Sequence, residues 1–158
     1  MTVIQTLGID HVDLTVTDLA RSVAFYAEIF PALGFRRIPE EPGHVWASAH
    51  LSIAIRPAEE AEQSVAFNRF RAGLHHLAFR AFTRADVDCF HEYLIAQSVE
   101  ILDPPREYPE YGKGYYALFF SDPDRIKLEL VHHPWGFWRH VLASGEDRRP
   151  RHVTVSHE

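Results

Sequence analysis

Gly73-Leu74-His75-His76-Leu77-Ala78-Phe79 is a predicted strand that carries a histidine and also begins the second copy of a pattern met earlier in the chain. Moving back 65 positions gives Gly8-Ile9-Asp10-His11-Val12-Asp13-Leu14. When the two stretches are aligned, Gly73 matches Gly8 and His76 matches His11, and the alignment continues beyond them without a gap. This register predicts an internal duplication.

Both predicted strands run into a helix with a polar start and an apolar stripe. Thr17 or Asp18 can cap the first helix, and Thr83 followed by Asp86 resembles a capping box. The apolar residues behind these caps recur at helical spacing: Leu19, Val23, Tyr26 and Phe30 in the first helix, and Val87, Phe90 and Leu94 in the second. Further strands follow each helix, so each copy has the pattern βαβββ.

The 158 residues are predicted to form one α+β domain, residues 1–158, made of two tandem βαβββ modules. Module one covers about residues 7–57, a charged linker residues 58–72, module two about residues 73–132, and a C-terminal tail residues 133–158. The later strands are expected near 35–38, 44–49 and 51–56, and then near 99–102, 115–120 and 126–131. A ferredoxin-like pair of modules without a cup is the alternative architecture.

The segment Asp103–Gly114 carries three prolines and two glycines, which disfavour regular structure and predict a loop. A loop of this kind is either a lid over a site or a surface loop stiffened by proline, and both interpretations stay open. Tyr108 and Tyr111 would be the substrate contacts of a lid.

Composition is that of a soluble globular protein, with 46% hydrophobic residues, 24% charged residues and a formal net charge of −6 at pH 7. A nucleic-acid partner would normally require a basic face, so none is expected. No stretch approaches the ~20 apolar residues of a spanning helix, so no membrane partner is expected either. The single cysteine, Cys89, cannot form an internal disulfide, which fits a cytoplasmic location.

The C-terminal tail contains three large aromatic residues within four positions. Trp135, Phe137 and Trp138 are unfavourable in water together, so the tail is expected to pack on the module or on a second subunit.

His11, His76 and Glu129 are candidate ligands of a divalent metal ion. The duplication places the histidines at equivalent points of two strands, where they are expected to face each other, and alternation along the last strand puts Glu129 on one face with Lys127. Two neutral imidazoles and one carboxylate form a facial set that leaves positions open for water or substrate. Taken singly, each is better explained as a hydrogen-bonded core histidine or a solvent-facing carboxylate; the shared register favours a metal.

Three segments together resemble one known family: Asp10-His11-Val12-Asp13-Leu14-Thr15-Val16 with Asp18-Leu19 and Ser22-Val23-Ala24-Phe25-Tyr26, then His75-His76-Leu77-Ala78-Phe79, and Asp122-Pro123-Asp124 leading to Leu128-Glu129-Leu130. They are similar to motifs of the vicinal oxygen chelate superfamily. This superfamily includes glyoxalase I, fosfomycin-resistance thiol transferases, type I extradiol dioxygenases and bleomycin-binding proteins. The resemblance covers about residues 7–132.

This resemblance implies two βαβββ modules whose sheets form a half-open cup around a divalent ion held by His11, His76 and Glu129. The ion would be Zn, Ni, Mn, Co or Fe, and the chain would pair as a homodimer. The implied partner is a small-molecule substrate with neighbouring oxygens, bound through a metal that acts as a Lewis acid.

Two departures from the family pattern bear on the reaction. Ala54 stands where glyoxalase I usually has a fourth, glutamate ligand, and Phe119 stands ten residues before Glu129, where extradiol enzymes tend to carry tyrosine. The implied activity is glyoxalase-like lyase, isomerase or transferase chemistry. The alternatives are an iron-dependent extradiol dioxygenase and a non-catalytic small-molecule-binding protein of the bleomycin-resistance type.

Residues two positions from the candidate ligands share their strand face and are expected in the cup. Asp13 is the candidate catalytic base, with an ion pair to Arg56 or Arg80 as the competing interpretation. Glu129 is assigned a catalytic role through the metal. The predicted substrate-binding residues are Arg56, Arg80, Tyr108, Tyr111 and Phe119.

Overall fold

The computed structural model describes residues 8–39 and 43–134. The predicted packing of Trp135, Phe137 and Trp138 lies outside these residues. Within the described ranges, no helix has the length and apolar character that crossing a membrane requires.

The chain folds as the predicted pair of βαβββ modules. The first contains β1 (His11–Val16), α1 (Leu19–Ala32), β2 (Arg36–Ile38), β3 (His44–Ala47) and β4 (Ser52–Pro57). The second contains β5 (Leu77–Arg80), α2 (Arg84–Ala96), β6 (Ile101–Glu107), β7 (Tyr116–Ser121) and β8 (Lys127–His132). A short 3-10 helix, Glu60–Glu62, lies between them. The predicted α+β fold class is confirmed.

Each module forms one mixed four-stranded sheet, with the order β1-β4-β3-β2 in the first and β5-β8-β7-β6 in the second. The first strand of each module pairs in parallel with the last, and the other neighbours are antiparallel. Asp13 pairs with Ala54, and Ala78 pairs with Glu129. Ala54 and Glu129 therefore occupy equivalent positions. The two sheets stay open, as expected for a half-open cup.

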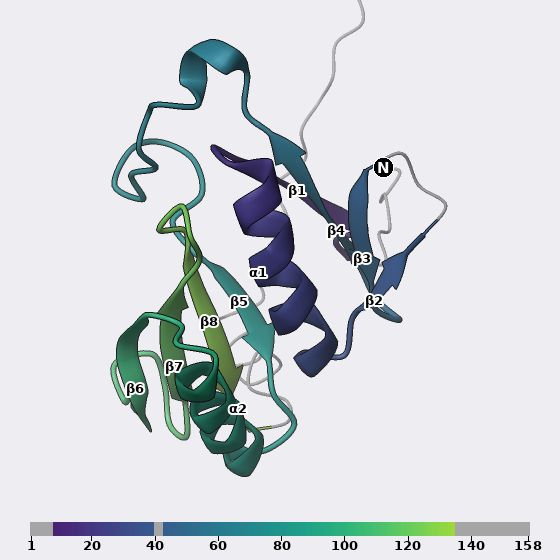
Figure 1. Ribbon diagram of the computed structural model, residues 1–158. Helices are drawn as coiled ribbons and strands as arrows, with labels where there is room; N and C mark the ends of the chain where they lie inside the picture. The colour runs from purple at the N-terminus through teal and green to yellow at the C-terminus, as the bar shows by residue number, and fades with distance from the viewer. Residues whose placement is uncertain (1–7, 40–42, 135–158) are drawn as a thin grey trace, which may run out of the picture.

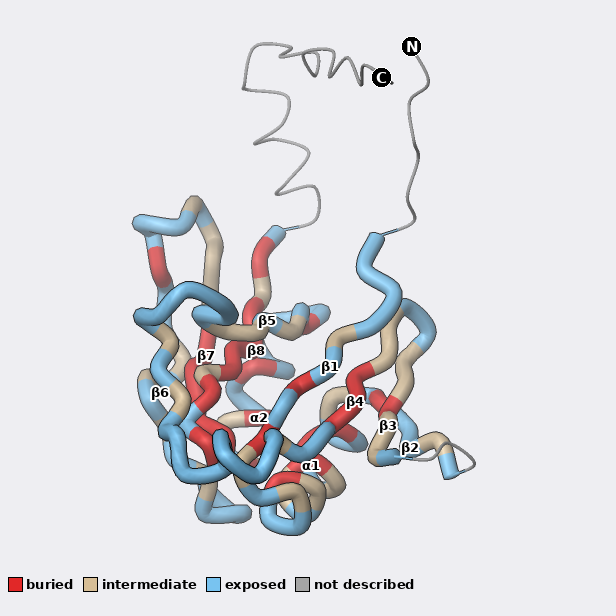
Figure 2. The backbone as a smooth tube through the Cα atoms, turned by 90° about the horizontal axis from the view of Figure 1, so that it is seen from above, coloured by how far each residue is buried: buried red, intermediate tan, exposed pale blue. Residues whose placement is uncertain are grey.

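One hydrophobic core joins the two modules. Apolar side chains from one face of each sheet pack against the helices, and α1 lies between the two sets of strands (Figure 1). The ring of Phe30 on α1 contacts Trp46 of β3 and Phe79 of β5, with ring centroids 5.4 and 6.3 Å apart. Burial alternates along β1 (Figure 2), because only one face of this strand is covered.

Side-chain caps begin both helices where the sequence predicts them. The carboxylate of Asp18 accepts the backbone N–H of Arg21 at 3.0 Å. In the second module Thr83 and Asp86 form a reciprocal capping box. Each cap satisfies a backbone donor that the first turn of a helix leaves free.

The prediction of an irregular loop over Asp103–Gly114 is wrong for its first five residues, which belong to β6. β6 is an edge strand, and its pairing with β7 changes register on both sides of Asp103. Pro104 and Pro105 lie within the second change of register, where the ladder does not need the N–H groups that prolines lack. The segment that could move as a lid is correspondingly shorter. A hydrogen bond joins the two ends of this segment, because the N–H of Tyr108 donates to the carbonyl of Tyr115 at 2.9 Å.

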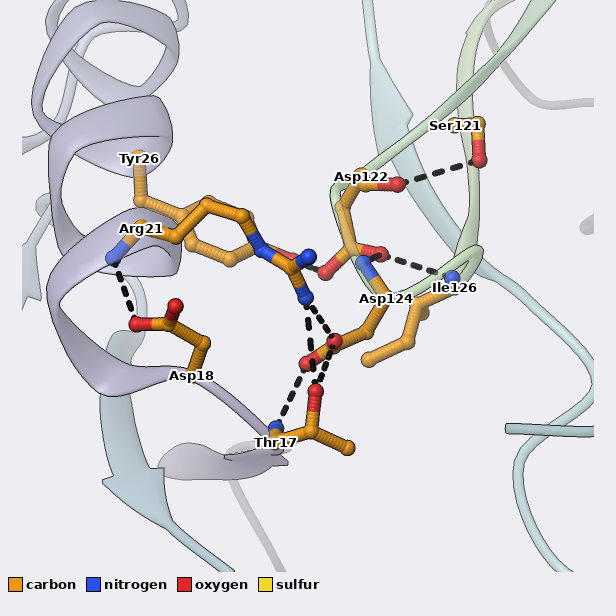
Figure 3. A network of polar contacts seen from close by, with 8 residues as sticks. All are labelled: Thr17, Asp18, Arg21, Tyr26, Ser121, Asp122, Asp124 and Ile126. Carbon is orange, nitrogen blue, oxygen red and sulfur yellow. Dashed lines mark hydrogen bonds and ion pairs between the residues drawn. The ribbon is translucent and has the colours of Figure 1, made fainter. Parts of the chain in front are cut away.

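Polar contacts join the start of α1 to the turn between β7 and β8 (Figure 3). The carboxylate of Asp124 accepts the backbone N–H of Thr17 at 2.7 Å and Nη2 of Arg21 at 2.6 Å. Beside it, Oη of Tyr26 donates to Asp122 at 2.8 Å. Both carboxylates are buried. These contacts fix the first module against the second.

Asp122 has no cation in direct contact among the described residues. Its Oδ1 accepts the backbone N–H groups of Asp124 at 2.9 Å and Ile126 at 2.7 Å. Burial raises the pKa of Asp122 to about 6, although these hydrogen bonds and the one from Tyr26 oppose the rise. The folded state therefore binds a proton here at a higher pH than the unfolded chain does.

We expect Asp122→Asn to change how stability depends on pH. Because the pKa of Asp122 is higher in the folded state, its contribution to stability is present below about pH 4 and is lost as the pH rises through about 6. Between pH 4 and 7 the unfolding free energy of the wild type should fall relative to that of Asp122→Asn by on the order of 2 kcal/mol. Urea denaturation of both proteins at a series of pH values measures this difference.

Tyr26→Phe is the matched control, because it removes the hydrogen bond that holds this pKa down. Its stability should fall more steeply with rising pH than that of the wild type. A pH-independent difference between the wild type and Asp122→Asn would contradict the assignment.

Candidate functional site

The second sheet carries polar side chains on the face turned away from the core. Along β8, Leu128 and Leu130 pack into the core, and Lys127 and Glu129 take the opposite face. Glu129 is nevertheless only 1% exposed. A carboxylate buried to this extent requires polar partners.

Glu129 has two such partners. Tyr115 donates its hydroxyl to Oε1 at 2.6 Å, and Nε2 of His76 lies 3.1 Å from Oε2. Burial raises the pKa of Glu129, and the Tyr115 hydrogen bond and the charge of Lys127 oppose this. Burial also lowers the pKa of His76, with contributions from neighbouring positive charges that include Lys127 and Arg69. The imidazole is thereby kept in the neutral form that binds metals.

The residue before each candidate histidine engages the other ring nitrogen. Nδ1 of His76 lies 2.8 Å from Nδ1 of His75, and Nδ1 of His11 lies 3.0 Å from Oδ2 of Asp10. Asp10 and His75 occupy equivalent places in the duplication. In both modules Nε2 is therefore the nitrogen left to face a ligand, as in metal sites whose histidines are oriented through Nδ1.

The predicted convergence of His11 with His76 and Glu129 is not found within one chain. The side chain of His11 is 63% exposed at the start of β1, and the hydrogen bond and charge of Asp10 raise its pKa. Residues 8–39 and 43–134 contain no group of three His, Cys, Asp or Glu side chains placed to hold a metal ion. The reason is that α1 lies between β1 and the strands of the second module (Figure 1).

Asp13, the predicted base, forms an ion pair with Nε of Arg56 on the neighbouring strand β4. This is the competing interpretation that the sequence offered. Arg80, the other predicted arginine, lies at the end of β5, where Nη2 is 3.5 Å from the carbonyl oxygen of His133. It also lines a pocket of about 310 Å³ together with His50 of the first module.

Aromatic rings surround the buried carboxylate on the second sheet. Phe119 packs edge-on against Tyr108 with ring centroids 5.2 Å apart, and Nζ of Lys127 lies 3.6 Å from the centre of the Phe119 ring. Tyr108 is only 3% exposed and stacks on Tyr111, which is 56% exposed. Phe119 and Tyr108 therefore form the wall of the candidate site, and Tyr111 lies at its rim.

Tyr115 and His75 contact the candidate ligands directly, yet the sequence prediction did not single them out. The signal for Tyr115, which directly precedes β7, is the alternation of that strand continued back by one residue. Residues 115, 117 and 119 then share one face, the face that Glu129 occupies in the paired strand β8. For His75 the signal is its position directly before His76, because Asp10 holds the equivalent position directly before His11 in the first module.

A family model described as the Glyoxalase/Bleomycin resistance protein/Dioxygenase superfamily matches residues 8–130. The protein YqjT of Bacillus subtilis is 36% identical to this chain over 122 residues, which cover 77% of this chain and 95% of YqjT.

Solved structures share the fold. A glyoxylase/bleomycin resistance protein/dioxygenase domain from Frankia sp. EAN1pec gives a TM-score of 0.68 at 28% identity, covering 82% of this chain and 100% of that domain. The fosfomycin resistance protein FosX from Listeria monocytogenes gives a TM-score of 0.61 at 25% identity, covering 83% of this chain and 97% of FosX. A mutant of the same FosX complexed with Mn(II) gives a TM-score of 0.61 at 24% identity, covering 84% of this chain and 94% of the mutant.

We expect Tyr115→Phe to raise the pKa of Glu129. The Tyr115 hydroxyl stabilises the ionised carboxylate and so lowers its pKa, whereas burial raises that pKa. Without the hydroxyl, the effect of burial is opposed less. NMR titration of chelator-treated protein, followed at the Glu129 carboxyl carbon, measures the change. Tyr116→Phe is the matched control, because the neighbouring hydroxyl bonds to Asp88 instead. Equal titration curves for Tyr115→Phe and the wild type would contradict this role.

Proposed function

Because the chain belongs to the Glyoxalase/Bleomycin resistance protein/Dioxygenase superfamily, we propose that it is a divalent-metal-dependent enzyme of the glyoxalase type. It would act on a small oxygenated organic substrate by lyase, isomerase or transferase chemistry. The observation that carries this proposal is the buried carboxylate of Glu129 beside Nε2 of His76.

The donor atoms of these two residues fit a divalent ion. Nε2 of His76 and Oε2 of Glu129 are 3.1 Å apart, and two adjacent ligands of an octahedral ion with bonds of about 2.1 Å are separated by about 3.0 Å. Imidazole and carboxylate together suit Zn, Ni, Mn, Co and Fe. A bound divalent ion supplies Lewis-acid stabilisation to neighbouring oxygens of a substrate.

We assign the third ligand position to His11 of a second copy of the chain. His11 is exposed, and the face of β1 that carries it also exposes Asp13 and, on β4, Arg56. A single chain brings only His76 and Glu129 together. A homodimer in which the first module of one copy faces the second module of the other would complete the cup.

The remaining residues of the site have roles that follow from their contacts. Tyr115 holds the Glu129 carboxylate in place through Oε1, which leaves Oε2 for a ligand. Phe119 and Tyr108 exclude water from this carboxylate on the β7 side. The assignment of Asp13 as the base stays a prediction, because its ion pair with Arg56 supports the competing interpretation.

An iron-dependent extradiol dioxygenase is the second candidate. Tyr115 favours it, because this residue brings a hydroxyl to Glu129 even though Phe119 has none. A metal-free binding protein of the bleomycin-resistance type is disfavoured, because Nε2 of His76 and Oε2 of Glu129 lie at the separation of two ligands of one divalent ion.

Metal analysis of protein purified without chelator, combined with a screen of catechols under oxygen, distinguishes the candidates. We expect nickel, zinc, manganese or cobalt at about one ion per chain, with no oxygen consumption. Iron together with ring cleavage would establish the dioxygenase instead. Absence of any bound metal, with no affinity for added Ni²⁺ or Mn²⁺, would overturn the metal-dependent assignment.

Mixing two inactive variants tests whether each site is shared between two copies. His11→Ala and Glu129→Ala should each bind metal poorly. After unfolding and refolding together, half of the dimers pair one variant with the other, and each such dimer contains one intact site. Metal binding should therefore recover to about one quarter of the wild-type level. No recovery would overturn the assignment of His11 of the second copy to the site.

A further inference from the structure

We propose that a pocket between the linker and the end of the second sheet binds a phosphoryl or phosphonyl group of the substrate. This inference rests on the proposed function, because it names the substrate class of that same site.

The pocket has a volume of about 540 Å³ and is lined by residues 66–71 of the linker, by the end of β7 and by Arg125 in the turn between β7 and β8. Figure 1 shows the linker beside this turn. Arg69, Arg71 and Arg125 bring three positive charges to the lining, against one negative charge from Glu100. The pocket is thus basic in a chain whose net charge is −6.

Within residues 8–39 and 43–134, these three guanidinium groups have no carboxylate within ion-pair distance. Elsewhere, Arg21, Arg56 and Arg84 each form an ion pair. Arg69 instead lies over the ring of Phe70, with Cζ 4.9 Å from the ring centre. Like charges gathered in one pocket repel one another unless a shared anion offsets them.

A short stretch of β7 and β8 separates the pocket from the buried carboxylate. Ser121, which lines the pocket, is the cross-strand partner of Lys127, and the next pair on the same face is Phe119 with Glu129. Two residues along a strand span about 6.7 Å. Lys127 bridges part of this distance, because its Nζ lies 3.6 Å from the centre of the Phe119 ring. A substrate of a few carbon atoms can therefore reach from one end to the other.

Three guanidinium groups match a phosphoryl or phosphonyl group better than a carboxylate. Such a group has three terminal oxygens, each of which accepts charge-assisted hydrogen bonds, whereas a carboxylate has two.

Calorimetric titration of the chelator-treated full chain with inorganic phosphate, methylphosphonate and acetate at low salt tests the proposal. We expect phosphate and methylphosphonate to bind and acetate to bind at least about tenfold more weakly. Arg125→Gln and Arg69→Gln should each weaken phosphate binding about tenfold, the typical effect of losing one charge-assisted contact. Arg125→Lys should retain most of the affinity, because it keeps the charge.

Arg84→Gln is the matched control, since it removes one positive charge at the start of α2, where Arg84 pairs with Glu107. It should leave phosphate affinity within about twofold. The proposal is overturned if the wild type binds no phosphate, if acetate binds as well as phosphate, or if Arg84→Gln weakens binding as much as Arg125→Gln.

Ni²⁺ binding to the same variants distinguishes failure of the anion pocket from failure of the proposed metal-dependent function. Arg125→Gln should bind Ni²⁺ as the wild type does. Phosphate binding that depends on the arginines, in a chain that binds no metal, would support the anion pocket and reject the metal-dependent reaction. Metal binding without phosphate binding would reject the pocket alone.

Discussion

The fold depends on the contacts between the two carboxylates of the β7–β8 turn and the N-terminal half of α1. Asp124 binds Thr17 and Arg21, and Asp122 binds Tyr26, so the first module is held by the turn from which β8 leaves. These groups are buried, and buried polar groups are stable only when they are paired. The relative position of the modules is therefore set by a few directional contacts in addition to a shared apolar core.

This arrangement decides which sheet faces stay open. Because α1 and the core occupy the inner faces, the outer face of the first sheet exposes His11 and the outer face of the second holds Glu129. The site on the second sheet is preorganised by Tyr115 and His76, which satisfy a carboxylate that water does not reach. The first sheet supplies an exposed histidine whose Nδ1 is already engaged.

The two modules share one pattern but have diverged in chemistry. Ala54 and Glu129 hold equivalent register positions, so only the second module contributes a carboxylate. Asp10 and His75 also correspond, and each contacts the histidine that follows it. The first module thus carries one candidate metal ligand, and the second carries two. This distribution is expected of a site assembled from two unlike halves.

The sequence by itself determined the duplication, the order of the elements, the helix caps and the equivalence of Ala54 with Glu129, because these follow from periodicity and local hydrogen bonding over a few residues. It misjudged the strand through Pro104 and Pro105, since only the pairing partner shows that β6 is an irregular edge. Tertiary structure alone decided that α1 separates His11 from His76, that Tyr115 reaches Glu129, and that the linker arginines line one pocket with Arg125. These relations join residues far apart in the chain, and contacts of that kind are set by packing between modules, which leaves no local signal in the sequence.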